Sequence, residues 1–297
     1  MPRISDLGED ALVARLTSLL SSGPGVLAGP GDDCAVVEGS ARGEVELLKT
    51  DCLVEGIHYR PNAMASKVGR KAVARTLSDF AAMGGWPRHL LLTIALPPDR
   101  EVRWVEGLYR GMNKCAQQYE CAIVGGETSS LPVGAPVVIS VAATGFAKRT
   151  QLTMRSAGQR GDLLFVTGRL GGSRKGRHLT FTPRLVEARW LTEKFRVHAM
   201  MDLSDGLAMD LPRLAAASGC GFRLDRESVP RTRGVTVGQA IGDGEDYELL
   251  FALSPRSAKR LQAEWARQFS RLRLTCIGSL TDCEGPLLDG GWDHFAS

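Results

Sequence analysis

Six short acidic motifs are spread along this chain, and each sets an Asp or Glu beside glycine or another small residue. Their acidic members are Asp32 and Asp33, Asp51, Asp79, Glu127, Asp202 and Asp205, and Glu245, Asp246 and Glu248. They span about 215 residues, so they are no local charge run, and their small neighbours leave room for a bulky ligand. Carboxylates that meet in a fold repel one another unless cations compensate them. The pattern therefore predicts converging Mg²⁺ ligands and, since Mg²⁺ is usually shared with substrate phosphates, a nucleoside triphosphate.

Each motif taken alone is most simply a turn, because Asp and Gly dominate turns, and only the joint occurrence favours a metal site. The familiar phosphate-binding motifs are absent. The sequence has no G-x-x-x-x-G-K-[ST], and Asp79-Phe80 is followed by Ala81 rather than by the glycine of a protein kinase. The serine elbow G-x-S-x-G is missing as well. Any phosphoryl transfer here must use metals and loop backbones of another architecture.

Bulk composition narrows the class of protein. The length of 297 residues with 43% hydrophobic content favours two domains, and a net charge of +4, evenly spread, argues against nucleic acid as a partner. Seven cysteines, an odd number without C-x-x-C spacing, are typical of buried thiols in a reducing compartment. No signal peptide is recognisable, and the longest apolar run, 90–98, is too short to span a bilayer. We expect a cytoplasmic protein without a membrane partner.

Hydrophobic periodicity divides the chain into two halves that both mix helices and strands, which predicts an α+β fold with domains at 1–147 and 148–297. In the first half we expect helices at 7–20, 67–83 and 101–119, and strands at 45–53, 90–96, 121–124 and 136–146. In the second half we expect helices at 207–217 and 254–269, and strands at 163–167, 199–203, 221–224, 247–253 and 272–277. The Gly-, Arg- and Lys-rich stretch 168–177 is predicted to be a mobile surface loop.

Taken together and in order, the motifs resemble the thiamine-monophosphate kinase family over nearly the whole chain. The resemblance is carried by Gly31-Asp32-Asp33-Cys34-Ala35, by residues 50–59 and 77–84, by Gly125-Gly126-Glu127-Thr128, by Met154-Arg155-Ser156, by Asp202-Leu203-Ser204-Asp205-Gly206-Leu207, by Gly244-Glu245-Asp246-Tyr247-Glu248 and by Trp292-Asp293-His294-Phe295. An ordered set of this size is far more specific than any one motif.

The resemblance implies a two-domain PurM-like fold, shared with aminoimidazole-ribonucleotide synthetase, in which the N-terminal sheets of a homodimer form a common barrel. It implies direct in-line transfer of the ATP γ-phosphoryl group to thiamine monophosphate, giving thiamine diphosphate, with Mg²⁺ and without a phosphoenzyme. ATP and thiamine monophosphate would then be the small-molecule partners.

Carried onto this sequence, the resemblance implies the following site residues. The metal ligands would be Asp33, Thr50, Asp51, Asp79, Glu127, Asp202 and Asp205, with Asp51, Asp79 and Asp205 central to catalysis. ATP would meet Gly126, Glu127, Arg155, Ser204 and Tyr109. Thiamine monophosphate would meet His58, Glu245 and Trp292, and an indole face suits a cationic thiazolium ring. Without the family context, His58 could equally be a hydrogen-bonded structural histidine, and Trp292 would more simply pack in the core.

Four departures from the family pattern keep other functions open. Glu127 stands where the family usually has Asp, Lys49 replaces a small residue, Asp243 replaces a glycine, and the stretch 171–184 is shortened. Lys49 is expected either to point away from the metal cluster or to substitute for part of its positive charge. The alternatives are a relative that acts on another substrate, such as an aminoimidazole-ribonucleotide synthetase-like enzyme, and a nucleotide-binding homologue without turnover.

Overall fold

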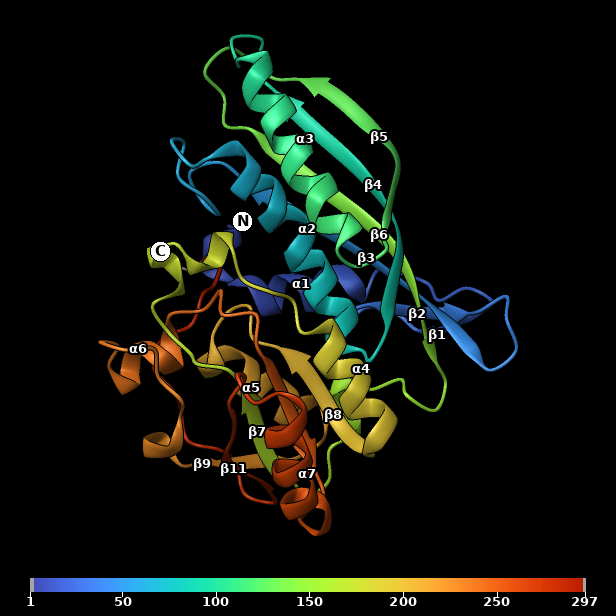
Figure 1. Ribbon diagram of the computed structural model, residues 1–297, viewed down its shortest axis with the longest axis vertical. Coiled ribbons are helices and arrows are strands. Elements are labelled where there is room, and N and C mark those ends of the chain that lie inside the picture. The colour runs from blue at the N-terminus through green and yellow to red at the C-terminus, as the bar shows by residue number, and fades with distance from the viewer. Residues whose placement is uncertain (1–2, 296–297) are drawn as a thin grey trace.

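The computed structural model describes residues 3–295, and it contains two β-sheets joined by a common core (Figure 1). The first sheet has six strands in the order β1-β2-β3-β6-β4-β5, and the second has five in the order β8-β10-β7-β11-β9. Every pairing of neighbouring strands is antiparallel except that of β4 with β5. No helix in the described part of the chain is long and apolar enough to cross a membrane.

In the first half, helices α2 and α3 cover one face of the sheet (Figure 1). Its elements are α1 (Glu9–Thr17), β1 (Val26–Ala28), β2 (Ala35–Glu38), β3 (Glu44–Val54), α2 (Ala65–Ala82), β4 (Trp86–Leu96), α3 (Val102–Gln117), β5 (Ala122–Ser130) and β6 (Val138–Lys148), after a 3₁₀ turn at Ile4–Asp6. Helices α2 and α3 cross closely because both present glycine at the contact. A Cβ on Gly69 would lie 2.0 Å from Leu108 O, and one on Gly111 would lie 2.0 Å from Ser66 O.

The second half places helices around a strongly apolar sheet. Its elements are β7 (Leu163–Thr167), α4 (Leu185–Lys194), β8 (Val197–Asp202), α5 (Leu207–Ala217), β9 (Gly221–Leu224), α6 (Val237–Gly242), β10 (Leu249–Leu253), α7 (Pro255–Gln268) and β11 (Leu274–Thr281), with 3₁₀ turns at Arg155–Ala157, Ser173–Lys175, Arg177–Leu179 and Arg226–Ser228. All five residues of β10 are buried, as expected for a central strand with packing on both faces.

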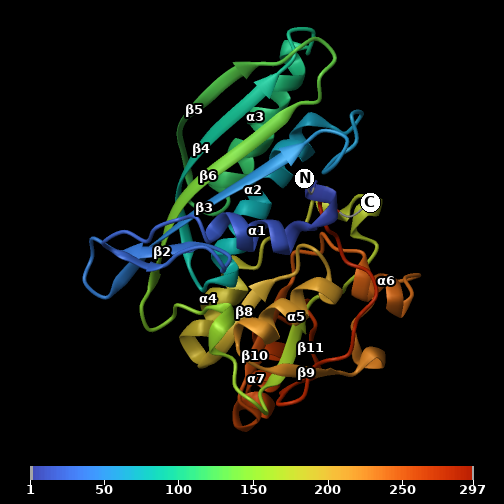
Figure 2. The same cartoon turned by 180° about the vertical axis from the view of Figure 1, so that it is seen from behind.

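The two halves are not separated by solvent. Phe165 and Met200 of the second half belong to the same buried cluster as Leu77 and Phe80 of α2. Helix α1 lies against the second half, where Asp10 pairs with Arg213 at 2.8 Å (Figures 1 and 2). The second sheet lies beside α2, so residues from both halves can meet there. The division at residue 147 stays a prediction.

Most predicted elements are present, but two segments that bear on the site differ from expectation. Strand β5 extends to Ser130 instead of ending at residue 124, because pairing with β4 continues through Gly125, Gly126 and Glu127. The stretch 168–177 was expected to be mobile, yet Gly171 N donates to Asp246 and Gly172 N donates to Asp243 Oδ2 at 2.7 Å. Strands β1 and β2 and helices α4 and α6 were not predicted. Helix α1 ends at Thr17, and none of its residues is buried.

Candidate active site

Three carboxylates from distant parts of the sequence meet where the two halves join. Asp33 lies just before β2, Asp79 lies near the end of α2, and Asp202 is the last residue of β8. All three are buried, and each offers an oxygen that lies within 4.8 Å of the others. A donor set made only of carboxylate oxygens could hold a hard divalent cation.

Basic and hydroxyl groups partly compensate this acidic cluster. Lys49 Nζ lies 2.9 Å from Asp79 Oδ1, Arg155 pairs with Asp33, and Ser78 Oγ donates to Asp202 Oδ2 at 2.5 Å. Lys49 therefore points into the cluster and supplies part of its positive charge, the second of the two expected roles. Burial would lower the pKa of Lys49, but Asp79 and Asp51 together hold that pKa above its ordinary value.

Two of the three carboxylates, Asp202 and Asp79, are hard to ionise without a further cation. Burial, and then the nearby Asp33, raise the pKa of Asp202 to about 7. Burial also raises the pKa of Asp79 well above its usual range. Groups held in this way become fully charged when a divalent cation binds, which is the behaviour of metal ligands.

Two further predicted residues line the same cavity, which has a volume of about 100 Å³. Asp51 Oδ1 lies 3.3 Å from Arg75 Nη2, and its Oδ2 is buried without a hydrogen-bond partner in residues 3–295. Asp205 Oδ2 lies 2.5 Å from Arg213 Nη1. The cavity wall also includes the predicted nucleotide-binding residues Arg155 and Ser204. Seven of the predicted residues thus surround one acidic space.

A second, smaller cavity adjoins the first and contains the three residues predicted for thiamine monophosphate. His58, Glu245 and Trp292 line a space of about 20 Å³. This space shares Arg75, Ser204, Asp205 and Tyr247 with the acidic cavity. The two sets of predicted residues therefore lie next to each other.

Hydrogen bonds hold His58 and Glu245 in defined charge states. His58 Nδ1 accepts a hydrogen bond from Val54 N at 3.0 Å, and burial and then Arg75 lower the pKa of His58 to about 4, so the imidazole is neutral. Burial would raise the pKa of Glu245, but bonds from His178 at 3.0 Å and from Lys71 outweigh it and lower that pKa to about 2. Glu245 is therefore charged.

Trp292 stays outside the two main core clusters and is only half-buried. Its backbone N–H donates to Asp205 O at 2.9 Å, which positions the indole beside the acidic cavity. The Arg174 guanidinium carbon lies 4.3 Å from the centroid of the indole ring. One face of the indole is therefore already stacked against a cationic group, the guanidinium of Arg174.

Four predicted residues do not join either cavity within this chain. Thr50 and Asp51 are neighbours on β3, so their side chains point to opposite faces, and Thr50 Oγ1 lies 3.5 Å from Ser140 Oγ. Gly126 and Glu127 lie on the edge strand β5, and Tyr109 is exposed on α3.

The sheet register shows how far Glu127 is from β3. Glu127 pairs with Thr93, Thr93 with Ser140 and Ser140 with Cys52, so three strand spacings separate β5 from β3. At about 4.8 Å per spacing this is about 14 Å. Gly126 also has a structural role, because a Cβ there would lie 1.9 Å from Leu92 O of β4.

The site also contains residues that the motifs did not single out. Lys71 and Arg75 precede Asp79 at intervals of four along α2, so all three lie on one helix face. Lys71 has no exposed surface, and Arg75 faces Asp51. Their spacing of four residues before Asp79 was a usable sequence signal, although α2 also carries Lys67 and Arg70. Arg174, His178 and Arg213 had no such signal.

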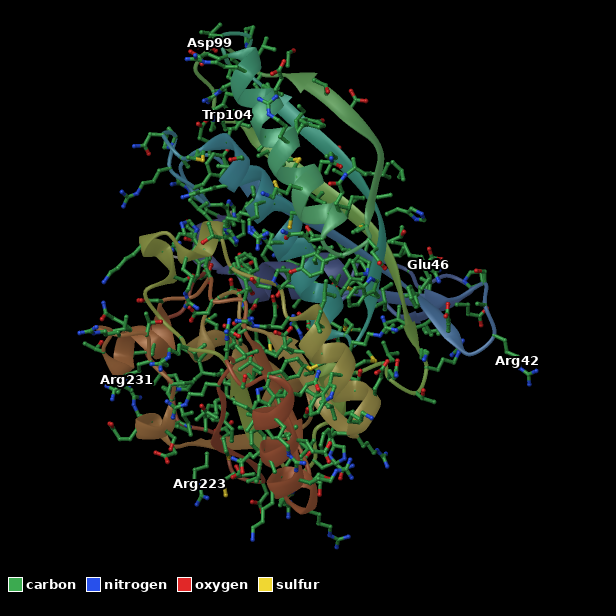
Figure 3. All side chains as sticks on the ribbon, viewed as in Figure 1. Arg42, Glu46, Asp99, Trp104, Arg223 and Arg231 are labelled. Atoms are coloured by element: carbon green, nitrogen blue, oxygen red, sulfur yellow. The ribbon has the colours of Figure 1, made fainter. Side chains whose placement is uncertain are left out.

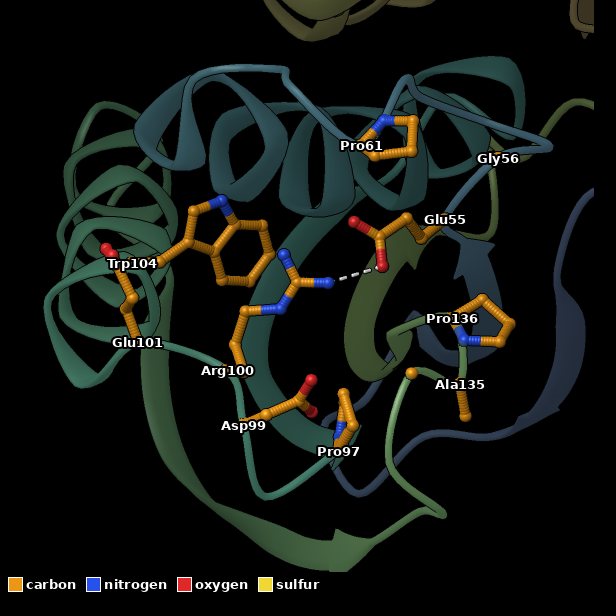
Figure 4. A pocket seen from close by; sticks show the side chains of 11 residues that line it. Glu55, Gly56, Pro61, Pro97, Asp99, Arg100, Glu101, Trp104, Ala135 and Pro136 are labelled. Carbon is orange, nitrogen blue, oxygen red and sulfur yellow. Dashed lines mark hydrogen bonds and ion pairs between the residues drawn. The ribbon is translucent and has the colours of Figure 1, made fainter.

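A third cavity, of about 500 Å³, lies at the far end of the first half (Figures 3 and 4). Its charges are largely paired within the protein. Arg100 Nη2 lies 2.6 Å from Glu55 Oε2, and the Arg100 guanidinium stacks 4.9 Å from the Trp104 ring (Figure 4). Val137 N also donates to Glu55 Oε2, at 3.0 Å. This arrangement ties β3, β6 and the start of α3 together and contains none of the predicted site residues.

Comparison with known proteins agrees with this geometry. Family models for AIR synthase related proteins match the N-terminal domain at residues 31–147 and the C-terminal domain at 137–268. A thiamine-monophosphate kinase of Rhodopirellula baltica is 36% identical over 89% of this chain and 88% of its own, and one of Salmonella typhimurium is 32% identical over 98% and 99%. A solved structure described as AaThiL complexed with AMPPCP and TMP superposes with a TM-score of 0.85 at 31% identity, covering 99% of both chains. The two-domain PurM-like fold is thus confirmed, and the chain belongs to the thiamine-monophosphate kinase family.

Proposed function

We propose that the protein transfers the γ-phosphoryl group of ATP to thiamine monophosphate in an Mg²⁺-dependent reaction. The observation that carries this proposal is the contact between two cavities, one built from Asp33, Asp79 and Asp202 and the other from His58, Glu245 and Trp292. The same fold in the solved relative holds an ATP analogue together with TMP, which supports assigning one substrate to each cavity.

The acidic cavity suits the triphosphate end of ATP. Asp33, Asp79 and Asp202 would hold Mg²⁺, with Asp51 and Asp205 on the same wall. Mg²⁺ bound there would neutralise phosphate charge, which is the main requirement of phosphoryl transfer. Arg155, with Ser204 beside it, would position phosphate oxygens, and the charge of Lys49 would add to that of the metal.

The adjoining cavity suits the thiamine moiety. The indole of Trp292 can stack against a cationic ring, as it does against Arg174. Glu245 brings a partly buried negative charge, held by Lys71 and His178. Because Nδ1 of the neutral His58 accepts from Val54 N, its Nε2–H is left as a donor. Because Ser204 and Asp205 belong to both cavities, the acceptor phosphate would lie beside them, in line with the triphosphate.

The residues left outside the cavities support a homodimer in which the first sheets of two subunits face each other. Figure 2 shows the face of this sheet that lies opposite α2. On this face, Leu48, Leu91 and Val124 are 39%, 49% and 57% exposed. Thr50 and Glu127 belong to the same face. Pairing of two such faces would bury the apolar side chains and bring Thr50, Gly126 and Glu127 of one subunit towards the cavities of the other. Tyr109 lies on α3, on the other face of the sheet, so this pairing gives it no role.

An assay of purified protein with ATP, Mg²⁺ and thiamine monophosphate tests the proposal. We expect thiamine diphosphate and ADP in equal amounts, and neither product from an Asp51→Asn variant. ADP release with aminoimidazole-type acceptors but not with thiamine monophosphate would favour the alternative that the protein acts on another substrate, as an aminoimidazole-ribonucleotide synthetase-like enzyme does. Calorimetric ATP binding without transfer to any acceptor would favour the homologue without turnover.

A further inference from the structure

An arginine-lined cavity of about 610 Å³ lies in the second half of the chain, apart from both cavities of the candidate site. Five of its 15 lining residues are arginines, in a chain with 29 arginines among 297 residues. They are Arg169, Arg177, Arg184, Arg271 and Arg273. Glu248 is the one carboxylate among the lining residues.

Two of the five arginines are neutralised by the protein. Arg184 holds Glu248 with two bonds of 2.7 and 2.6 Å, and Arg177 Nη2 lies 2.5 Å from Asp246 Oδ1. Both carboxylates are buried, so these pairs are part of the folded core. Arg177, Arg184 and Glu248 of these pairs line the cavity.

The other three arginines have no carboxylate partner within residues 3–295. Arg169 Nη1 donates to Arg231 O at 3.2 Å, and Arg273 Nε donates to Thr275 Oγ1 at 3.1 Å. Arg271 makes no ion pair in the described part of the chain. Three like charges around one cavity repel one another, and a bound anion removes that repulsion.

The cavity rests on a rigid frame. Gly168 N donates to Arg273 O at 2.8 Å, which joins the end of β7 to the start of β11. Trp265 Nε1 donates to Leu272 O at 2.9 Å, which fixes the turn after α7. Thr232, Gln262 and Ser270 add uncharged donors to the wall. These bonds hold together the backbone segments that carry Arg169, Arg271 and Arg273.

We propose that this cavity binds a small phosphorylated anion at a site separate from the kinase reaction. Arginine forks match phosphate oxygens, and the volume lies within the range of small-molecule sites. An anion bound here would contact Arg177 and Arg184, which hold Asp246 and Glu248, next to Glu245 of the candidate substrate site. The assignment does not depend on the proposed kinase activity.

Calorimetry of the full-length protein in EDTA, with inorganic diphosphate as the probe, tests this assignment. Omitting Mg²⁺ removes the metal through which the acidic cavity would hold phosphate groups, and two double variants then show whether the arginine-lined cavity accounts for the binding that remains. The double variant Arg271→Ala/Arg273→Ala should weaken binding at least about tenfold, because it removes two charge-assisted contacts. The matched control is Arg256→Ala/Arg267→Ala, which removes the same charge from α7 outside the cavity and should change binding less than about twofold.

A cooperative urea unfolding transition, followed by circular dichroism, shows that both double variants are folded. ADP serves as a second probe. Equal affinity for ADP and diphosphate would show that the cavity recognises the phosphate groups alone. Tighter binding of ADP would show that it recognises the nucleoside as well. The assignment is overturned if neither probe binds. It is also overturned if both double variants weaken binding equally, because binding would then depend on the general positive charge of this region and not on the cavity.

Discussion

The guanidinium of Arg174 stacks on the indole of Trp292, with 4.3 Å between the guanidinium carbon and the ring centroid. Arg174 also lies 3.9 Å from Glu245 Oε2, so it contacts two of the three residues proposed for thiamine monophosphate. A cationic substrate ring that stacks on Trp292 must displace it. The shortened stretch 171–184 thus puts a competing cation on the proposed substrate surface.

The first prediction concerns this competition. Arg174→Ala should lower the KM for thiamine monophosphate about two- to fivefold and leave kcat nearly unchanged, whereas Trp292→Ala should raise that KM about 2- to 30-fold, the range of a cation–π contact. Steady-state kinetics measure both. Lys175→Ala is the control, because it removes a neighbouring exposed charge. A raised KM in Arg174→Ala would show that this side chain binds the substrate instead of competing with it.

The second prediction concerns pH and Mg²⁺. In the metal-free protein, burial and then Asp33 raise the pKa of Asp202 to about 7. The folded state then binds more protons than the unfolded state between about pH 4 and about pH 7, so the stability of the metal-free protein should fall as the pH rises through that window. Mg²⁺ must displace the proton, so its affinity should rise at least about tenfold from pH about 6 to about 8.

Titration calorimetry with Mg²⁺ at several pH values checks this expectation. Asp202→Asn should bind Mg²⁺ more weakly and with a flatter pH dependence. Asp282→Asn, which changes an exposed carboxylate outside the cavities, should behave as the unmodified protein does. A pH-independent affinity in the unmodified protein would remove Asp202 from the proposed ligand set.

The third prediction follows from the position of Glu127, about 14 Å from β3 across the sheet. If Glu127 serves the site of the partner, Asp51→Asn and Glu127→Gln subunits should each be inactive alone. An equal mixture, unfolded and refolded together, should recover about a quarter of the unmodified activity, because half of the dimers are mixed and each has one intact site. No recovery, with mixed dimers verified by mass spectrometry, would assign both residues to one subunit.

Most of the acidic cavity was predictable, because five of its carboxylates sit in short motifs that occur in a recognisable order. Asp210, which also lines the cavity, lies inside α5 and belongs to none of these motifs. Successive side chains of a strand point to opposite faces, so adjacency in sequence was misleading at Thr50 and Asp51, which face opposite ways on β3. Composition likewise predicted a mobile stretch at 168–177. The backbone donors of that stretch are held by carboxylates about 70 residues away, and no local pattern shows such partners.

The fourth prediction separates a structural from a nucleotide-binding role at Gly126. A Cβ on Gly126 would meet Leu92 O at 1.9 Å, a backbone atom of β4, whereas one on Gly125 would meet only the flexible Leu91 side chain at 3.3 Å. Gly126→Ala should therefore lower the free energy of unfolding by about 1–3 kcal/mol, as overpacking does, while Gly125→Ala changes it little. Urea unfolding measures the difference. If Gly126→Ala instead kept full stability and only raised the KM for ATP, close approach of a nucleotide, and not of β4, would be the reason for this glycine.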